Sequence, residues 1–152
     1  VDAIQKYEEK GTGSILYSVY AMAKATAGDG DMLTGEGHVY LAEQQVIKDL
    51  AMRGPAVFLG HCASEALKEK KQVIKVFIRC SDEAVKISRI EKEYGIPSAE
   101  ADSTRKRFDR KRANYYYANT GRKWDNYRNY DIVLDSAALG IEGCAAVLKS
   151  LL

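Results

Sequence analysis

The chain has 152 residues, of which 46% are hydrophobic and 29% charged, a composition typical of a single globular domain with its own core. The formal net charge of +2 excludes a strong overall field, so we expect neither a nucleic acid nor a membrane as a partner. Three widely spaced cysteines and the lack of a long apolar run predict a cytoplasmic protein without disulfides or a metal cluster.

Apolar residues that recur every three to four positions predict helices along most of the chain. The predicted helix at 36–52 has its apolar stripe at Val39, Ala42, Val46 and Leu50. The alternating Gly and Asp residues at 28–31 lack the late Glu of a calcium loop and predict a plain loop. The predicted helices cover residues 15–27, after a turn at 11–14, then 36–52, a short stretch to about 67, 83–94, 98–119 and 141–152.

A continuous apolar run between turn residues predicts a strand at 56–60 that is buried on both faces, and runs rich in branched residues predict strands at 73–80 and 131–135. Strands that alternate with helices indicate a parallel sheet that is covered on both faces. The predicted fold class is therefore α/β, with three α/β/α layers and a mostly parallel sheet in one domain over residues 1–152. In such folds ligands bind beyond the carboxyl ends of the strands. The residues that follow the first predicted strand are Gly60, His61 and Cys62.

The long predicted helix carries a strongly basic stretch. At about 100° per residue, Arg105, Asp109 and Arg112 share one narrow sector, so that two guanidinium groups flank one carboxylate. One interpretation is a set of solvated ion pairs, each worth a few tenths of a kcal/mol. The other is an anion site, because a guanidinium offers a planar fork of donors to phosphate oxygens. We expect the front half of this helix to bury little and to stand in solvent over a cleft. A second cationic surface is formed by Arg107, Arg110 and Lys111.

Several segments share residues with one known family. They are 60–63 (GHCA), the strand and helix at 73–94, 109–116 (DRKRANYY), 120–124 (TGRKW) and 129–136 (NYDIVLDS). Together they resemble the cytidylate kinase-like family, a branch of the nucleoside monophosphate kinases, over roughly residues 36–152. The resemblance implies a P-loop kinase-like fold with a lid at about 95–123. It also implies ATP-dependent phosphoryl transfer to a nucleoside monophosphate such as CMP or dCMP, with Mg²⁺.

The resemblance assigns roles where residues match. Arg105 and Arg112 would hold the acceptor phosphate and steady the transferred phosphoryl group, while Asp109 would orient both. Arg110 would contact the donor phosphates. The residues that would line the monophosphate pocket are Gly60, His61 and Cys62. Phosphoryl transfer needs positioning and positive charge more than covalent chemistry, which suits arginine.

The sequence departs from the family pattern in two places. Cytidylate kinases carry Arg-Asp where this chain has His61 and Cys62, so the nucleobase stays open. The phosphate-binding pattern G-x-x-x-x-G-K-[ST] does not occur in the 152 residues. By resemblance, the strand that precedes this loop lies between the strands at 56–60 and 73–80. Without it, both neighbouring strands would carry unpaired N–H and C=O groups, so we expect such a sheet to be unstable. We therefore expect an N-terminally incomplete domain. A strand supplied by another chain or a rearranged N-terminus, and a rebuilt sheet that has lost ATP binding, are alternatives.

Three classes of function are consistent with the sequence. The first is a kinase with ATP and a nucleoside monophosphate as partners, and the second is a non-catalytic remnant that binds a nucleotide or phosphate. The third is an RNA-binding module that uses the basic helix and the tyrosines at 115–117, and the near-neutral total charge argues against it. Trp124 is predicted to be a packing anchor, with base stacking as the alternative. A homo-oligomer is left open.

Overall fold

The computed structural model describes residues 35–151, with side chains from residue 40 on, and the chain divides into two compact units, Val1–Val73 and Ile74–Leu152. The predicted turn at 11–14, helix at 15–27 and loop at 28–31 lie outside the described residues. The assignment of residues 1–152 to one domain stays a prediction. No described helix is both long and apolar enough to cross a membrane, and the three cysteines are free thiols.

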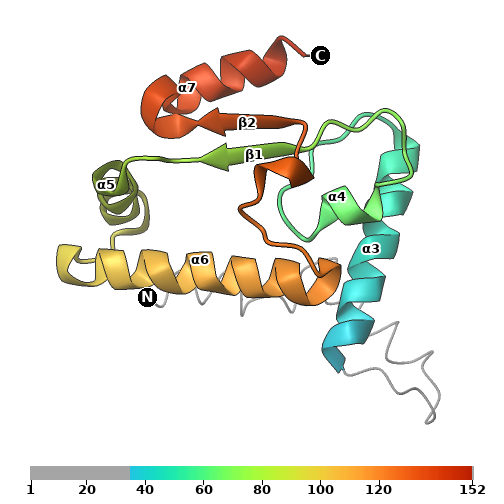
Figure 1. Cartoon of the computed structure of the whole chain (residues 1–152), viewed down its shortest axis with the longest axis horizontal. Helices are drawn as coiled ribbons and strands as arrows, with labels where there is room; N and C mark the ends of the chain where they lie inside the picture. The colour runs from blue at the N-terminus through green and yellow to red at the C-terminus, as the bar shows by residue number, and fades with distance from the viewer. Residues whose placement is uncertain (1–34, 152) are drawn as a thin grey trace. The chain divides into compact units, whose positions relative to one another are not determined.

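The first unit contains helix α3 (Gly35–Arg53) and the short helix α4 (Ala63–Ala66), joined by an extended segment (Figure 1). The predicted helix at 36–52 is confirmed, but its buried face is displaced from the expected stripe. Leu50 is exposed, whereas Glu43 and Gln44 are buried beside the apolar positions. The core of the unit consists of Ile47, Ala51, Ala63, Ala66 and Leu67, with Phe58 and Val73 packed against it.

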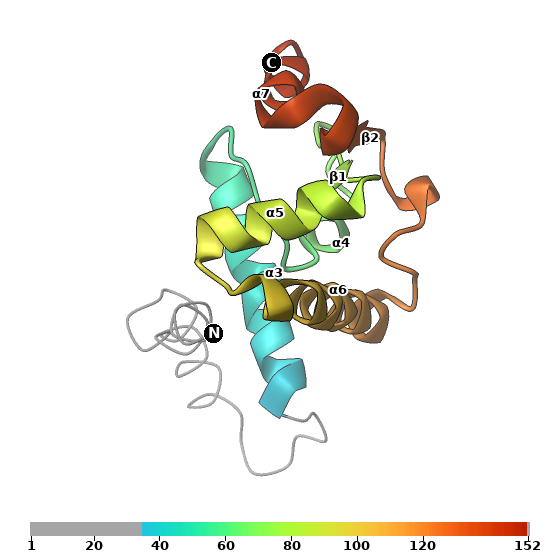
Figure 2. The ribbon, with the colours of Figure 1, turned by 90° about the vertical axis from the view of Figure 1, so that its left-hand side faces the viewer.

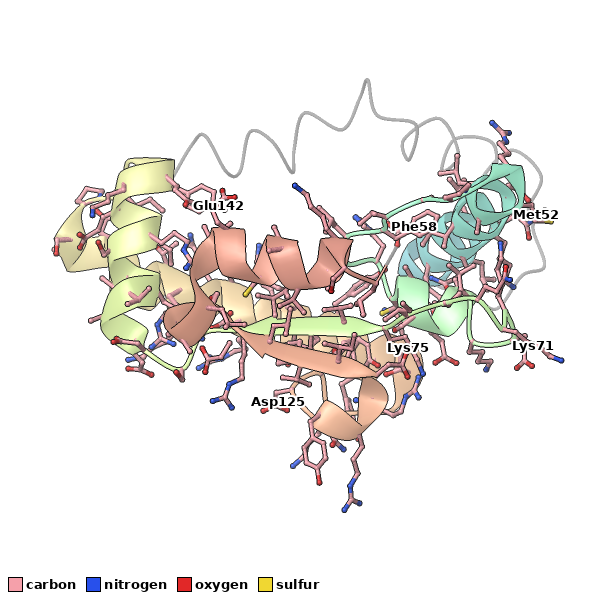
Figure 3. All side chains as sticks on the ribbon, turned by 90° about the horizontal axis from the view of Figure 1, so that it is seen from above. Met52, Phe58, Lys71, Lys75, Asp125 and Glu142 are labelled. Carbon is pink, nitrogen blue, oxygen red and sulfur yellow. The ribbon has the colours of Figure 1, made fainter. Side chains whose placement is uncertain are left out.

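The predicted strand at 56–60 is wrong. Val57 and Leu59 are each 85% exposed, while Phe58 between them packs on the core of the first unit (Figure 3). A strand needs a neighbour to take up its N–H and C=O groups, and no described segment pairs with these residues. The run is therefore an extended segment that inserts one side chain, and the sheet of the described residues has two strands instead of three.

We expect Phe58→Ala to lower the free energy of unfolding by about 1 kcal/mol, because it removes half-buried apolar surface from this small core. Val57→Ala, the control, should change it by less than about 0.5 kcal/mol because that side chain is exposed. Urea unfolding of both variants measures the difference. Equal losses would mean that Val57 is covered and that the segment is a strand after all.

The second unit is built on a parallel pair of short strands, β1 (Val76–Arg79) and β2 (Ile132–Asp135), in the register Val76↔Ile132 to Arg79↔Asp135. The predicted strands at 73–80 and 131–135 are thus confirmed in kind, although β1 is shorter. Helix α7 (Ser136–Lys149) contacts both strands (Figure 1) and starts earlier than expected, with a kink at Gly140, where φ is 68°. The described residues form a mostly helical α/β structure with this small parallel sheet.

Helices α5 (Glu83–Tyr94) and α6 (Ser98–Thr120) form the rest of the unit and pack against each other (Figure 2), and a one-turn 3₁₀ segment, η2 (Tyr127–Asn129), precedes β2. Asp82 caps α5 by accepting hydrogen bonds from the N–H groups of Ala84 at 2.8 Å and Val85 at 3.2 Å. Ala101 is 0% and Thr104 5% exposed. The expectation that the front half of α6 buries little is therefore wrong, because α5 covers one side of it.

Asp135 joins the carboxyl ends of the two strands. Its carboxylate accepts hydrogen bonds from the N–H groups of Ser81 and Ala137, both at 3.0 Å, and from Arg79 Nε at 3.1 Å. The hydrogen bonds from Ser81 are the main reason that the pKa of Asp135 lies well below its ordinary value. This carboxylate therefore links the carboxyl ends of β1 and β2 to the loops that follow them.

We expect Asp135→Asn to destabilise the protein at pH 7 and to make a smaller difference at pH 2. A carboxyl group whose pKa is lowered by folding contributes stability above its unfolded pKa of about 3.9, and this contribution is lost as the pH falls toward the folded pKa. Thermal unfolding at several pH values measures the effect, with the exposed Asp125→Asn as the control. A Tm difference between wild type and Asp135→Asn that persists unchanged at pH 2 would contradict this account.

Candidate functional site

Helix α6 presents Arg105, Asp109 and Arg112 on successive turns. Asp109 Oδ2 lies 3.8 Å from Arg105 Nη1, and Asp109 Oδ1 lies 3.8 Å from Arg112 Nη1. The predicted row of guanidinium, carboxylate and guanidinium is therefore confirmed as geometry. At this distance the contacts are ion pairs and not direct hydrogen bonds, so the row is not locked by its own members.

Arg105 is the buried member of the row. Its side chain is 10% exposed, and its Nε and Nη2 donate to Asp102 Oδ1 at 3.0 and 2.7 Å. Glu83 of α5 lies 3.4 Å from Nη2, so the guanidinium ties the two helices together. The hydrogen bonds that Arg105 donates to Asp102 are the main reason that the pKa of Arg105 is raised. Asp102 therefore already accepts from two N–H groups of Arg105, and the predicted contact of Arg105 with a nucleotide stays a prediction.

Arg112 is the exposed member. Its side chain is 60% exposed, and its guanidinium carbon lies 5.8 Å from the ring centre of Trp124. Trp124 in turn packs edge-on against Phe77 of β1 with 5.2 Å between the ring centres, and Tyr130 stacks on Phe77 at 4.9 Å. The prediction that Trp124 is a packing anchor is confirmed. Arg112 is thus steadied by a carboxylate and an indole while its guanidinium remains open to solvent.

Three more charged residues lie beside the row of Arg105, Asp109 and Arg112. Lys86 of α5 lies 3.8 Å from Asp109, and Glu83 and Asp102 hold Arg105. Asp102 stands three residues before Arg105, so helical spacing alone could have found it. Glu83 and Lys86 come from another helix, and only the packing of α5 on α6 brings them here.

A different face of α6 is strongly cationic and carries Arg110. It surrounds a shallow depression of 340 Å³ that is lined by Ser103, Lys106, Arg107, Arg110, Lys111 and Asn114. Lys106 is paired with Asp102 at 2.6 Å, and the Phe108 ring lies 5.5 Å from the guanidinium carbon of Arg107 and 6.0 Å from Lys111 Nζ. The second cationic surface predicted from the sequence is therefore present. Arg110 belongs to this surface and not to the row.

The predicted pocket residues Gly60, His61 and Cys62 lie in the first unit, directly before α4. All three have positive φ angles, of 72°, 52° and 51°. The Cys62 side chain is buried, so its thiol lies away from solvent, whereas the His61 side chain is 50% exposed. Of this group, His61 is the side chain that offers a polar contact to a ligand. Glu43, which sequence reasoning missed, holds its ring.

A site for ATP and Mg²⁺ needs cations for the phosphates and oxygen ligands for the metal. Within residues 35–151 no three or more His, Cys, Asp or Glu side chains gather as metal ligands. At phosphate-transfer sites Mg²⁺ is usually coordinated by one or two carboxylates together with substrate phosphates. For ATP, the described residues that suit phosphate are the cations around the depression on α6.

Comparison with known proteins gives a family and a fold. Residues 1–138 match a family described as the cytidylate kinase-like family. The structure is similar to the crystal structure of an uncharacterized protein from Eubacterium ventriosum ATCC 27560, with a TM-score of 0.70 and 21% sequence identity over 89% of this chain and 72% of that one. At this identity the likeness shows the fold alone. No curated protein matches the sequence significantly.

Proposed function

Because the chain belongs to the cytidylate kinase-like family, we propose that it binds a nucleoside monophosphate of the CMP or dCMP type and transfers a phosphoryl group to it from ATP. The observation that carries this proposal is Arg112, whose exposed guanidinium is steadied between Asp109 and Trp124. An exposed guanidinium whose carboxylate neighbour lies 3.8 Å away keeps its donors available for a phosphate.

The members of the row have different parts in this proposal. Arg112 contacts the phosphate of the monophosphate, and Asp109 keeps Arg112 aimed while balancing its charge in the absence of a ligand. Arg105 supports the site from within, because it fixes α6 against Glu83 of α5. The cationic face around Arg110 is assigned to the donor phosphates. Mg²⁺ would neutralise charge on the phosphates of ATP.

A coupled assay with ATP, Mg²⁺ and each of CMP, dCMP and UMP tests the activity. We expect turnover with at least one of them and a lower rate for Arg112→Ala. Lack of turnover with all three would exclude the kinase activity for this chain. A positive result would also identify the base, which the His61-Cys62 pair leaves open.

A second candidate is a protein that binds a nucleoside monophosphate without catalysis. It is favoured by one observation, which is that the G-x-x-x-x-G-K-[ST] pattern of the ATP-binding loop does not occur in the 152 residues. Calorimetry separates the two candidates. CMP binding that weakens with salt, together with no heat from ATP, supports the non-catalytic protein, whereas tight ATP binding excludes it.

A further inference from the structure

Lys86 of α5 is a cation beside the row that has no part in the function proposed above. Helix α5 packs against α6 (Figure 2), and Lys86 Nζ lies 3.8 Å from Asp109 Oδ2. The other oxygen of the same carboxylate, Oδ1, lies 3.8 Å from Arg112 Nη1. One carboxylate therefore stands between a cation of α5 and a cation of α6, and both helices belong to the second unit.

The ion pairs around the row contain more cations than carboxylates. The cations are Lys86, Arg105, Lys106 and Arg112, and the carboxylates are Glu83, Asp102 and Asp109. Asp102 lies 2.7 Å from Arg105 and 2.6 Å from Lys106, and Glu83 lies 3.4 Å from Arg105. Among the described residues, Asp109 is the carboxylate that pairs with Lys86 and Arg112. The surplus positive charge therefore belongs to these two cations.

The pair of Lys86 and Asp109 is a poor tether between the helices. At 3.8 Å the contact is not a direct hydrogen bond, so Asp109 does not occupy the donors of the ammonium group. Both side chains are 31% exposed, and an ion pair in such a position contributes little to stability. The buried Arg105 already joins α5 to α6 through Glu83. The packing of the two helices therefore leaves the donors of Lys86 available to a ligand.

The charge of a phosphate calls for a second cation at this place. A phosphate monoester carries a charge of about −1.5 to −2 at neutral pH. Arg112 and Asp109 together carry no net charge, so a dianion beside them alone would be poorly compensated. Lys86 supplies the missing charge, because its ammonium group stands on a flexible stem and its three donors can turn from Asp109 to a phosphate oxygen.

We infer that Lys86 is a second phosphate-binding residue, which donates to the same phosphate as Arg112 from the neighbouring helix. Its contact with a nucleotide rests on the function proposed above, whereas its place beside Asp109 rests on the packing of α5 on α6. Without a ligand, Asp109 shares its charge between the two cations. When a phosphate binds, both cations turn to it, and the surplus positive charge of the surface is neutralised.

The test is calorimetry of the full chain with CMP at several salt concentrations. We expect Lys86→Gln to bind CMP about tenfold more weakly than wild type, because one charge-assisted hydrogen bond is lost. Its affinity should also fall less steeply with salt, because one charge fewer meets the phosphate. Lys86→Arg keeps the charge and should retain most of the affinity. The exposed Lys92→Gln, on the same helix, is the matched control and should bind CMP as wild type does.

Thermal unfolding separates a phosphate contact from a structural role. The Tm of Lys86→Gln should stay within about 2 °C of that of wild type, because the ion pair with Asp109 is loose and partly exposed. A weaker affinity that comes with a large drop in Tm, and that Lys86→Arg does not restore, would mean that Lys86 acts by holding α5 on α6. This result would overturn the inference.

The remaining outcomes distinguish the inference from the proposed function. Equal CMP affinities of wild type and Lys86→Gln at every salt concentration overturn the inference and leave the proposed function standing. Equal losses in Lys86→Gln and Lys92→Gln also overturn it, because they indicate a general effect of charge. Failure of wild type to bind CMP at any salt concentration overturns both.

Discussion

Arg112→Ala should weaken CMP binding by about 2 kcal/mol, or roughly thirtyfold in Kd, if this side chain contacts the phosphate. The guanidinium is 60% exposed and its carboxylate neighbour, Asp109, lies at 3.8 Å, so its donors can turn to a ligand. Because the side chain is exposed, its removal should cost little folding stability. Calorimetry gives the affinity, and a thermal melt confirms that the variant is folded.

Arg128→Ala is the matched control. Arg128 belongs to the same unit and lies over an aromatic ring in the same manner, with 5.8 Å from its guanidinium carbon to the ring centre of Tyr127. It should bind CMP as wild type does. Equal losses in the two variants would indicate a general electrostatic effect, and no loss in either would make Arg112 an ordinary surface charge.

Arg105→Ala should reduce folding stability strongly, in contrast to Arg112→Ala, whose main effect is on CMP binding. Its side chain is 10% exposed and its guanidinium joins Asp102 and Asp109 of α6 to Glu83 of α5. Removal leaves three carboxylates without their shared cation and opens the α5–α6 contact. We expect a loss of about 2 kcal/mol in the free energy of unfolding, less than for a fully buried pair because the carboxylates are partly exposed.

Urea unfolding of Arg105→Ala and Arg105→Lys measures this effect. Lys keeps the charge but lacks the fork of donors that reaches two carboxylates at once, so it should restore only part of the stability. Raised salt should narrow the difference between wild type and Arg105→Ala. A variant as stable as wild type, with weakened CMP binding, would instead make Arg105 the phosphate contact.

Local patterns in the sequence predicted the helices and the row on α6, because each depends on spacing along one element. The predicted bounds of the helix at 83–94 are confirmed, with Asp82 as its N-cap and Gly95 as its C-cap. The parallel direction of the strands also followed from the alternation of strands and helices. These features need no knowledge of what packs against them.

Features that depend on tertiary partners were not predicted. The apolar run at 56–60 has the composition of a strand, but no described segment pairs with it, so Val57 and Leu59 remain exposed. Glu43, the partner of His61, stands on α3, 18 residues earlier in the chain. Glu83, one of the partners of Arg105, stands on α5. No periodic pattern reports a contact of that kind.

The central claim is that Arg112 contacts the phosphate of a nucleotide. NMR of the arginine Nε–Hε groups during a CMP titration tests it most directly, with cytidine as the ligand that lacks the phosphate. We predict a saturable shift of the Arg112 signal with CMP and none with cytidine, while the Arg105 signal, held by Asp102, moves little. An Arg112 signal that stays in place while CMP binds, or that moves equally with cytidine, would contradict the claim.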